Sequence, residues 1–384
     1  MVPAEEAGLS GRVSAHGCGM HMEVAEAPAN RRRPKGEASA APRSEADSHK
    51  TVNLALQGGG AHGAFTWGVL DRLLEDERLV IDGISATSAG AMNGAVLVYG
   101  MAEGGREGAR ALLHQFWRRI ADSARYSVFQ PTPLDRMLGN FDLDHSPVYQ
   151  AFDLMTRVLS PYQLNPTDIH PLRDLLGELI DFDRLHQKTP IKLYVSATNA
   201  RTGKIRVFQP EEICADVLLA SSCLPWLFRA VEINGDAYWD GGYIGNPAMF
   251  PLLYGCRASD IVLVEINPIR IDEIPTTARA IMDRINDISF NATMMREMRT
   301  IAFVTQLLDQ HRLIGKTRYR RINFHMIEAE QAMARFGVSS KFNADWDFLT
   351  RLFELGRRTA DAWLARNYGR LGHESTVDMQ TLFF

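Results

Sequence analysis

A serine between small residues is the first group in this chain that could do chemistry. Ser88 stands in "GISATSAGAMNG" (83–94), where an apolar run gives way to an alanine-rich one. A serine on a sharp strand-to-helix turn exposes its hydroxyl above the sheet, and its neighbours must be small to avoid collisions. The usual pattern is G-x-S-x-G, and here Ala86 and Gly90 flank the serine in "ATSAG". Ser88 is therefore a candidate nucleophile, with a helix N-cap serine in an ordinary turn as the alternative.

A glycine-rich segment, "GGGAHG" (58–63), lies between a predicted strand and a predicted helix. Gly58, Gly60 and Gly63 fit the G-x-G-x-x-G fingerprint of dinucleotide-binding proteins, whose backbone amides hold a pyrophosphate. The acidic residue of that fingerprint should end the next strand, but Asp82 lies near the start of that strand. The same geometry can aim free amides at the negative charge that develops in acyl transfer. The segment therefore predicts either a dinucleotide site or an oxyanion hole.

An aspartate, rather than a histidine, is the better candidate for the base that would activate Ser88. Asp240 ends an apolar strand in "YWDGGYIGNP", and the two residues that follow, Gly241 and Gly242, let the backbone turn so that the carboxylate faces a cleft. None of the 11 histidines, His62 included, follows a strand in the Gly- or Asp-rich loop that a triad histidine tends to occupy. We expect no histidine to be indispensable, although Asp-Gly-Gly also occurs as a simple turn.

The elements that must position these residues read as repeated strand–turn–helix units. Residues 52–56 and 79–87 have the pattern of buried strands, and residues 64–74 and 89–99 have helical spacing of apolar residues. Two such units in so short a stretch predict an α/β fold with a mainly parallel sheet. Further along the chain, we expect hairpins over 191–210 and 230–242, strands over 260–267 and 319–327, and helices over 274–312 and 343–365.

Together the three motifs resemble those of the patatin-like phospholipases. In that family the glycine-rich loop forms the oxyanion hole, the elbow serine is the nucleophile, and the aspartate of an Asp-Gly-Gly or Asp-Gly-Ala motif is the only base. The resemblance covers residues 53–254, and Ala86, where the family has glycine, is its one departure. It implies a three-layer fold with the sheet sandwiched by helices, and a dyad of Ser88 and Asp240, with no cofactor and no metal. The residues that it assigns to the oxyanion hole are Gly58, Gly59, Gly60 and Ala61.

The resemblance implies a serine lipid acyl hydrolase that cleaves carboxylic esters through an acyl-enzyme. Asp240 would accept the Ser88 proton, and because an aspartate with a pKa of about 3.9 is a poor base, it must be partly desolvated. Phospholipid, lysophospholipid, neutral lipid, thioester and storage polyester are all compatible substrates. A non-catalytic lipid-binding protein on the same fold and a Rossmann-type oxidoreductase are the alternatives.

Composition sets the domain organisation. The chain has 384 residues, of which 46% are hydrophobic and 23% charged, and its formal net charge of −4 gives no global field that would attract nucleic acid. Residues 1–51 are rich in Ala, Pro, Ser and charge, which predicts a disordered tail. Residues 52–254 form the predicted catalytic domain, and residues 255–384 a mostly helical extension packed on it.

Cysteine usage and hydropathy indicate the compartment. The 4 cysteines are scattered without a CxxC pair, which favours reduced thiols and a cytoplasmic protein. No apolar run approaches the roughly twenty residues of a spanning helix, so we expect any contact with a membrane or lipid surface to be peripheral. Residues 127–166 could form a lid, and the apolar row over 285–304 packs on the core or touches a membrane. The oligomeric state is left open.

Overall fold

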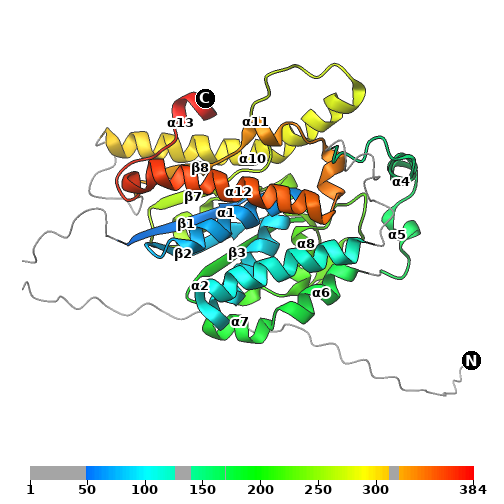
Figure 1. Ribbon diagram of the computed structural model, residues 1–384, viewed down its shortest axis with the longest axis horizontal. Helices are drawn as coiled ribbons and strands as arrows, with labels where there is room; N and C mark the ends of the chain where they lie inside the picture. Colours follow the sequence, from blue (N-terminus) through cyan, green and yellow to red (C-terminus); the bar gives the residue numbers. More distant parts are fainter. Residues whose placement is uncertain (1–48, 126–139, 169, 311–319) are drawn as a thin grey trace, which may run out of the picture. The chain divides into compact units, whose positions relative to one another are not determined.

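The computed structural model describes residues 49–125, 140–168, 170–310 and 320–384. Eight strands among these residues form one sheet in the order β5-β6-β3-β2-β1-β7-β8, with β4 paired to β3 (Figure 1). The strands are β1 (Lys50–Leu56), β2 (Leu79–Ala86), β3 (Lys192–Asn199), β4 (Ile205–Phe208), β5 (Val231–Ile233), β6 (Asp236–Asp240), β7 (Asp260–Val264) and β8 (Asn323–Ile327).

Strands β3, β2, β1, β7 and β8 run parallel, β4 and β6 each pair antiparallel with β3, and β5 pairs antiparallel with β6. Parallel neighbours need a long crossover, which the helices between them supply. Because parallel strands end at the same edge of a sheet, the glycine-rich loop after β1 and the serine turn after β2 lie together at the carboxyl edge. The register confirms this, since Leu56 pairs with Ala86.

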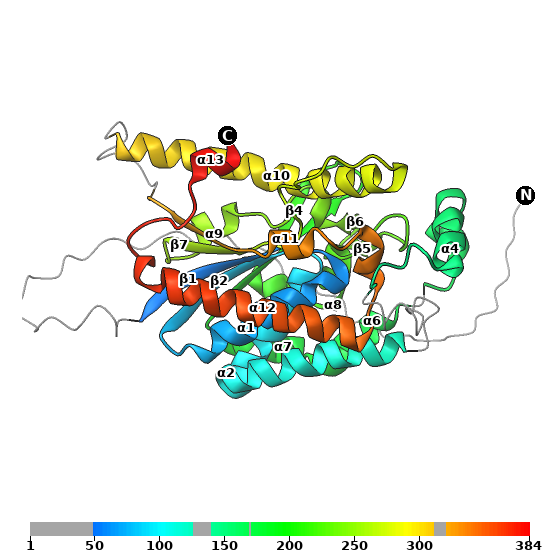
Figure 2. The same ribbon diagram turned by 45° about the horizontal axis from the view of Figure 1, so that its top comes forward.

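The helices cover both faces of the sheet and so make three layers. They are α1 (Gly63–Glu75), α2 (Ala89–Ala124), α4 (Pro147–Val158), α5 (Pro161–Leu164), α6 (Pro171–Leu179), α7 (Phe182–Lys188), α8 (Ala215–Ser221), α9 (Phe250–Gly255), α10 (Ala278–Asp309), α11 (Glu330–Met333), α12 (Trp346–Asn367) and α13 (Met379–Phe383). Helices α1, α2 and α12 lie on one face, and α9 and α10 on the other (Figure 2). Short 3-10 turns include η2 (Gly60–His62), η4 (Gly241–Tyr243) and η5 (Val338–Phe342).

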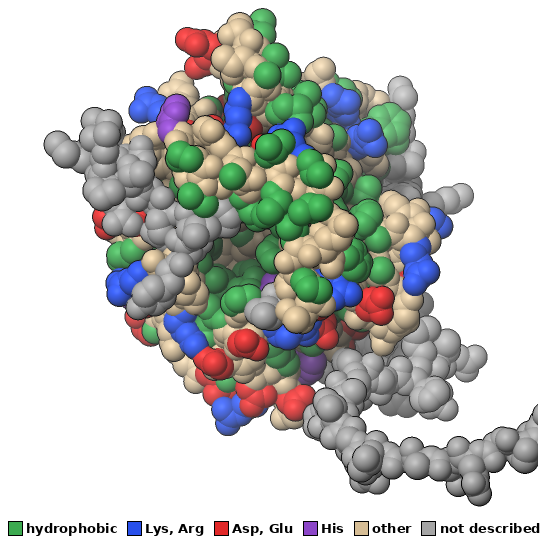
Figure 3. Space-filling model, turned by 90° about the vertical axis from the view of Figure 1, so that its right-hand side faces the viewer, with side chains coloured by type: hydrophobic (Ala, Val, Ile, Leu, Met, Phe, Trp, Pro, Cys, Tyr) green, Lys and Arg blue, Asp and Glu red, His purple; other side chains and the backbone are tan. Residues whose placement is uncertain are grey.

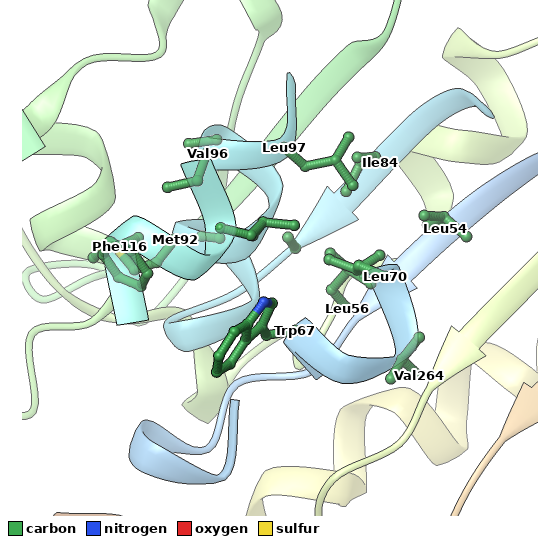
Figure 4. Packing of buried hydrophobic residues seen from close by; sticks show 14 of the residues in the cluster. Leu54, Leu56, Trp67, Leu70, Ile84, Met92, Val96, Leu97, Phe116 and Val264 are labelled. Atoms are coloured by element: carbon green, nitrogen blue, oxygen red, sulfur yellow. The ribbon is translucent and has the colours of Figure 1, made fainter. Parts of the chain in front are cut away.

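The core follows from the alternation of side chains along the strands. In β1, Leu54 and Leu56 point to the face covered by α1, where they pack with Leu70, while Ala55 points to the other face and joins Met294 of α10. Figure 4 shows the first of these clusters. A strand whose residues are buried on both faces reads as a continuous apolar run, which is why β1 and β7 could be predicted.

The predicted fold class is confirmed: a mainly parallel sheet lies between helices, and helices follow the last strand. Several boundaries differ by a few residues; β1, for example, begins at Lys50, inside the predicted tail, and β8 begins at Asn323. The largest difference is in α2, which continues from Tyr99 to Ala124 through a break at Gly104 and Gly105, the latter with a φ of 63°. The predicted tail falls outside the described residues up to position 48, as does the part of the predicted lid before residue 140. Within the described ranges, no helix combines the length and the apolar character that crossing a membrane requires.

Candidate active site

Ser88 lies on the turn between β2 and α2 in a conformation that few non-glycine residues adopt. Its φ is 54° and its ψ is −125°, a strained combination for an L-residue. The Ser88 amide donates a hydrogen bond to Ser221 Oγ at 2.9 Å, and the Thr87 hydroxyl donates one to the Gly245 carbonyl at 2.7 Å. Gly90, in the first turn of α2, donates its amide to the Thr87 carbonyl at 2.9 Å. The sharp strand-to-helix turn expected from "ATSAG" is therefore present.

Strand β3 lies between the serine turn and the aspartate and brings them together. It pairs with β2 on one side, with Val195 opposite Ala86, and with β6 on the other, with Ala197 opposite Asp240. The Ser88 side chain lies close enough to the Asp240 carboxylate to lower its pKa. Two residues that are far apart in the sequence thus meet because both flank the same strand.

Burial makes Asp240 far less acidic than an exposed aspartate. The residue is 1% exposed, and desolvation raises its pKa to about 7, against the opposing effects of the Gly242 amide and the Ser88 hydroxyl. That amide donates to Asp240 Oδ1 at 2.7 Å. The intervening residue must be glycine, because a Cβ at Gly241 would lie 2.2 Å from the Ser196 carbonyl oxygen. The desolvated carboxylate that acyl transfer requires is thus present.

Cys223 and Tyr243, which the sequence did not single out, lie beside Asp240, and Phe290 packs against Tyr243. The Cys223 carbonyl accepts the Asp240 amide at 2.7 Å. Burial, and then the charge of Asp240, raise the pKa of the Cys223 thiol to about 12 and that of the Tyr243 hydroxyl to about 12. The Phe290 ring lies 5.5 Å from the Tyr243 ring. Phe290 belongs to the apolar row predicted on α10, but only tertiary packing brings that row to the aspartate.

The glycine-rich loop has free backbone amides, but the Gly58 amide, which the resemblance assigns to the oxyanion hole, is not one of them. The Gly58 amide donates to Asn246 Oδ1 at 2.7 Å, so it is not free to bind an oxyanion in this structure. The next three amides have no hydrogen-bond partner in the part of the chain that the structure describes; they belong to Gly59, Gly60 and Ala61. The amide of Ala89, directly after Ser88, is likewise unpaired among those residues. Its position at the start of α2 makes it a further candidate that the motifs had not suggested.

A C-terminal segment, residues 336–348, contacts the glycine-rich loop through His62. His62 Nε2 lies 2.7 Å from Ser340 Oγ in η5, and the His62 ring packs against Phe336 and Phe348. The Ser340 hydroxyl donates to the Gly337 carbonyl at 2.8 Å, so it accepts its second hydrogen bond from His62. Burial lowers the pKa of His62 well below the ordinary value, so its ring is neutral. His62 therefore anchors the loop.

Residues that follow β7 hold the beginning of the same loop. Gln57 Oε1 accepts hydrogen bonds from the amides of Ile266 at 2.8 Å and Asn267 at 3.0 Å. Asn267 Nδ2 donates to the Gly58 carbonyl at 2.9 Å, and Lys341 Nζ donates to Asn267 Oδ1 at 2.9 Å. These supports lie far along the chain, and no local sequence pattern indicates them.

The remaining sequence candidates have structural uses. Gly63 begins α1, and its carbonyl accepts Asn93 Nδ2 at 2.9 Å, which ties α1 to α2. Asp82, whose position in the sequence does not fit the dinucleotide fingerprint, accepts a hydrogen bond from the Ala258 amide at 2.9 Å. It lies where the register between β1 and β2 shifts. Within the described ranges, no group of three His, Cys, Asp or Glu side chains could hold a metal ion. Ser88 itself is only 7% exposed, so the site is nearly closed.

A helix-covered, mainly parallel sheet with a serine on a strand-to-helix turn and a buried aspartate beside it defines the class of this protein. The family model for patatin-like phospholipases matches residues 54–253. The chain therefore belongs to the patatin-like phospholipase family and is an enzyme of that family. No curated protein sequence matches it.

Solved structures give distant similarities. VipD from Legionella pneumophila is 16% identical, with 80% of this chain and 67% of that chain covered and a TM-score of 0.34. The type III effector protein ExoU, whose complex with SpcU comes from Pseudomonas aeruginosa, is 16% identical, with 83% of this chain and 54% of that chain covered and a TM-score of 0.32. The chain thus spans about half the length of ExoU.

Proposed function

We propose that this enzyme hydrolyses carboxylic esters of lipids through a dyad in which Ser88 is the nucleophile and Asp240 the proton acceptor. The main support is a carboxylate that burial leaves with a pKa of about 7 and that lies beside the serine turn, across strand β3. A base with a pKa near the working pH accepts a proton efficiently and also returns it. Family membership supports a lipid ester as substrate, and we include peripheral contact with a lipid surface in the proposal.

The reaction has two halves. Ser88 Oγ attacks the ester carbonyl carbon while Asp240 takes the hydroxyl proton, and the carbonyl oxygen becomes an oxyanion that the amides of Gly59, Gly60 and Ala61 stabilise. The bond to the alcohol then breaks, and the alcohol leaves with the proton from the aspartate. Water attacks the acyl-serine as Asp240 takes a proton from it. Cleavage of that ester releases the fatty acid and returns the proton to Ser88.

We further propose that residues 255–384 complete the unit formed by residues 52–254 rather than acting separately. Strands β7 and β8 belong to the same sheet as β1. The supports of the glycine-rich loop, Asn267 and Ser340 among them, come from this region. A truncated enzyme that ends near residue 254 would lose both the sheet edge and those supports.

A fluorophosphonate probe tests the function directly. It should label wild-type enzyme on Ser88, and the labelled peptide can be identified by mass spectrometry. A panel of p-nitrophenyl esters of increasing chain length would then measure the acyl preference. A non-catalytic lipid-binding protein would bind the longer esters but acquire no label and release no p-nitrophenol.

The pH dependence of kcat/KM should report Asp240. The carboxylate accepts a proton only when ionised, and its pKa is raised to about 7, so we expect activity to rise with pH, about tenfold per unit below 7, and to level off above it. Initial rates with p-nitrophenyl butyrate, read at an isosbestic wavelength, measure the profile. A profile already flat at about pH 5 would mean that Asp240 either is exposed or is not the base.

The serine turn should tolerate only a small side chain at residue 86. It is fully buried at the end of β2, and a Cβ at Gly94 of α2 would lie 3.7 Å from the Ala86 Cβ. We expect Ala86→Gly to keep or slightly raise kcat, because it restores the family residue. Ala86→Val should lower kcat about a hundredfold, because crowding there moves Ser88 Oγ by about 1 Å. Equal activity of the valine variant and the wild type, with equal melting temperatures, would show that residue 86 does not set the turn.

A further inference from the structure

The first half of α10 is apolar on two opposite sides. Phe290 and Met294 pack into the protein, as expected for one side of a core helix. On the opposite side, Ile281, Ile285 and Ile288 follow at the i, i+4, i+7 spacing of a helical stripe and are 41%, 51% and 53% exposed. A helix buried on one side normally carries polar residues on the other. Core packing therefore does not account for the isoleucine stripe.

A second exposed apolar stripe lies on the neighbouring helix α4. Leu154 and Val158 are 65% and 75% exposed, and Met155 lies between them. The starts of the two helices are joined, because Arg279 of α10 donates to the Tyr149 hydroxyl of α4 at 3.3 Å. The six residues of the two stripes, Leu154, Met155, Val158, Ile281, Ile285 and Ile288, are called the α4–α10 surface below.

The two helices that carry this surface also contact the segments that form and support the candidate active site. On α10, Phe290 contacts Tyr243, which follows Asp240 in η4. On α4, the Tyr149 ring lies 6.3 Å from the Phe342 ring of η5, the segment that supports the glycine-rich loop. The side of the molecule that carries α4 faces the viewer in Figure 3, where hydrophobic side chains gather around a hollow.

We propose that the α4–α10 surface inserts into the surface of a phospholipid aggregate and so delivers ester carbonyls to Ser88. The inference rests on the proposed lipid acyl hydrolase function, and it adds where and how the enzyme meets its substrate. An aggregated lipid is the occupant that the position favours, because the proposed substrate is a lipid ester and both helices that carry the surface also contact segments of the site. Large exposed apolar patches beside a site mark such contacts.

The charges around the stripes indicate that insertion is apolar rather than electrostatic. Over residues 278–292 the two arginines, at 279 and 284, are balanced by two aspartates, at 283 and 287. On α4, Arg157 is paired with Asp153 at 3.1 Å. Surfaces that bind anionic lipids instead carry clusters of four or more Lys or Arg. The α4–α10 surface should therefore bind zwitterionic phosphatidylcholine and be insensitive to salt.

Sedimentation with phosphatidylcholine vesicles tests the proposal, using the Ser88→Ala enzyme so that no lipid is consumed. We expect this protein to sediment with the vesicles and its partition coefficient to change less than about twofold between about 0.1 M and about 1 M NaCl. Introducing both Ile285→Asp and Ile288→Asp into the Ser88→Ala enzyme should weaken its partitioning onto the vesicles at least about tenfold, because two charges would enter the apolar layer of the membrane. The matched control is Phe303→Asp, also made in the Ser88→Ala enzyme. Phe303 lies on the same side of α10, is 56% exposed, and is about 27 Å from Ile285 along the helix axis. This control should partition like Ser88→Ala.

Several outcomes would overturn the proposal. They are failure of Ser88→Ala to sediment, equal partitioning of the double-aspartate and Phe303→Asp variants, or binding that requires anionic lipid and is lost at high salt. Thermal melts of every variant exclude unfolding as the cause. Fluorophosphonate labelling of the wild type separates this proposal from the proposed function. Labelling without vesicle binding removes only the docking surface, whereas vesicle binding without labelling removes only the catalytic dyad.

Discussion

Replacing Ser88 by alanine, or Asp240 by asparagine, is expected to lower kcat by at least about a thousandfold, because a two-member catalytic unit loses nearly all its activity with either member. The Ser88 hydroxyl lowers the pKa of the Asp240 carboxylate, so the two side chains lie close together. Initial rates with p-nitrophenyl butyrate measure the effect, and the double variant should be no worse than either single one. More than about a tenth of wild-type activity in either variant would rule out the dyad.

The thermal stability of the Asp240→Asn variant shows whether its loss of activity comes from unfolding. Folding raises the pKa of Asp240 from 3.8 to about 7, so its contribution to stability is complete below the unfolded pKa and is lost as the pH rises through about 7. About three pKa units correspond to about 4 kcal/mol. Asparagine cannot ionise and avoids this cost, so the variant should melt at a higher temperature than wild type at about pH 8. A higher melting temperature with no activity separates catalysis from folding.

The strands of the sheet could be predicted where local pattern and tertiary role agree. β1 and β7 are apolar runs because both their faces are buried, and the β5–β6 hairpin turns at Asn234 and Gly235, which have φ values of 52° and 83°. The length of α2 could not be predicted, because two glycines interrupt its helical pattern. The glycines do break the helix, as their low helix propensity predicts, and a second helical segment follows directly.

In the candidate site, too, the residues that stand in local motifs could be predicted, and those contributed by distant segments could not. Ser88, Asp240 and the glycine-rich loop stand in short motifs, because each needs small neighbours within a few residues. The residues that support them come from distant segments: the Cys223 carbonyl accepts the Asp240 amide, Phe290 packs against Tyr243, and Ser340 anchors the loop through His62. Nothing near these residues in sequence indicates their role. The engagement of the Gly58 amide by Asn246 is a tertiary contact of the same kind.

Gly58→Ala should be nearly as damaging as removal of the dyad, because the loop touches the serine turn at this position. A Cβ there would lie 2.6 Å from the Ser88 Cβ and 2.9 Å from the Thr87 carbonyl oxygen. Both atoms belong to the strained turn and cannot yield without moving the nucleophile. If the loop moves instead, the free amides of Gly59 and Gly60 leave the position of the oxyanion. We expect kcat to fall about a thousandfold, since loss of a single oxyanion donor already costs about a hundredfold or more.

The matched control for this loss is Gly177→Ala in α6, where a Cβ would meet no heavy atom within 4 Å. Alanine is favoured over glycine inside a helix by about 1 kcal/mol, so this variant should keep full activity and melt slightly higher. Both variants are compared by kcat and by the rate of fluorophosphonate labelling, because labelling also requires an oriented serine and an oxyanion hole. Suppose Gly58→Ala folds and labels within about tenfold of the wild-type rate. The loop then does not press on the serine turn, and the oxyanion must be stabilised elsewhere, with the Ala89 amide at the start of α2 the next candidate.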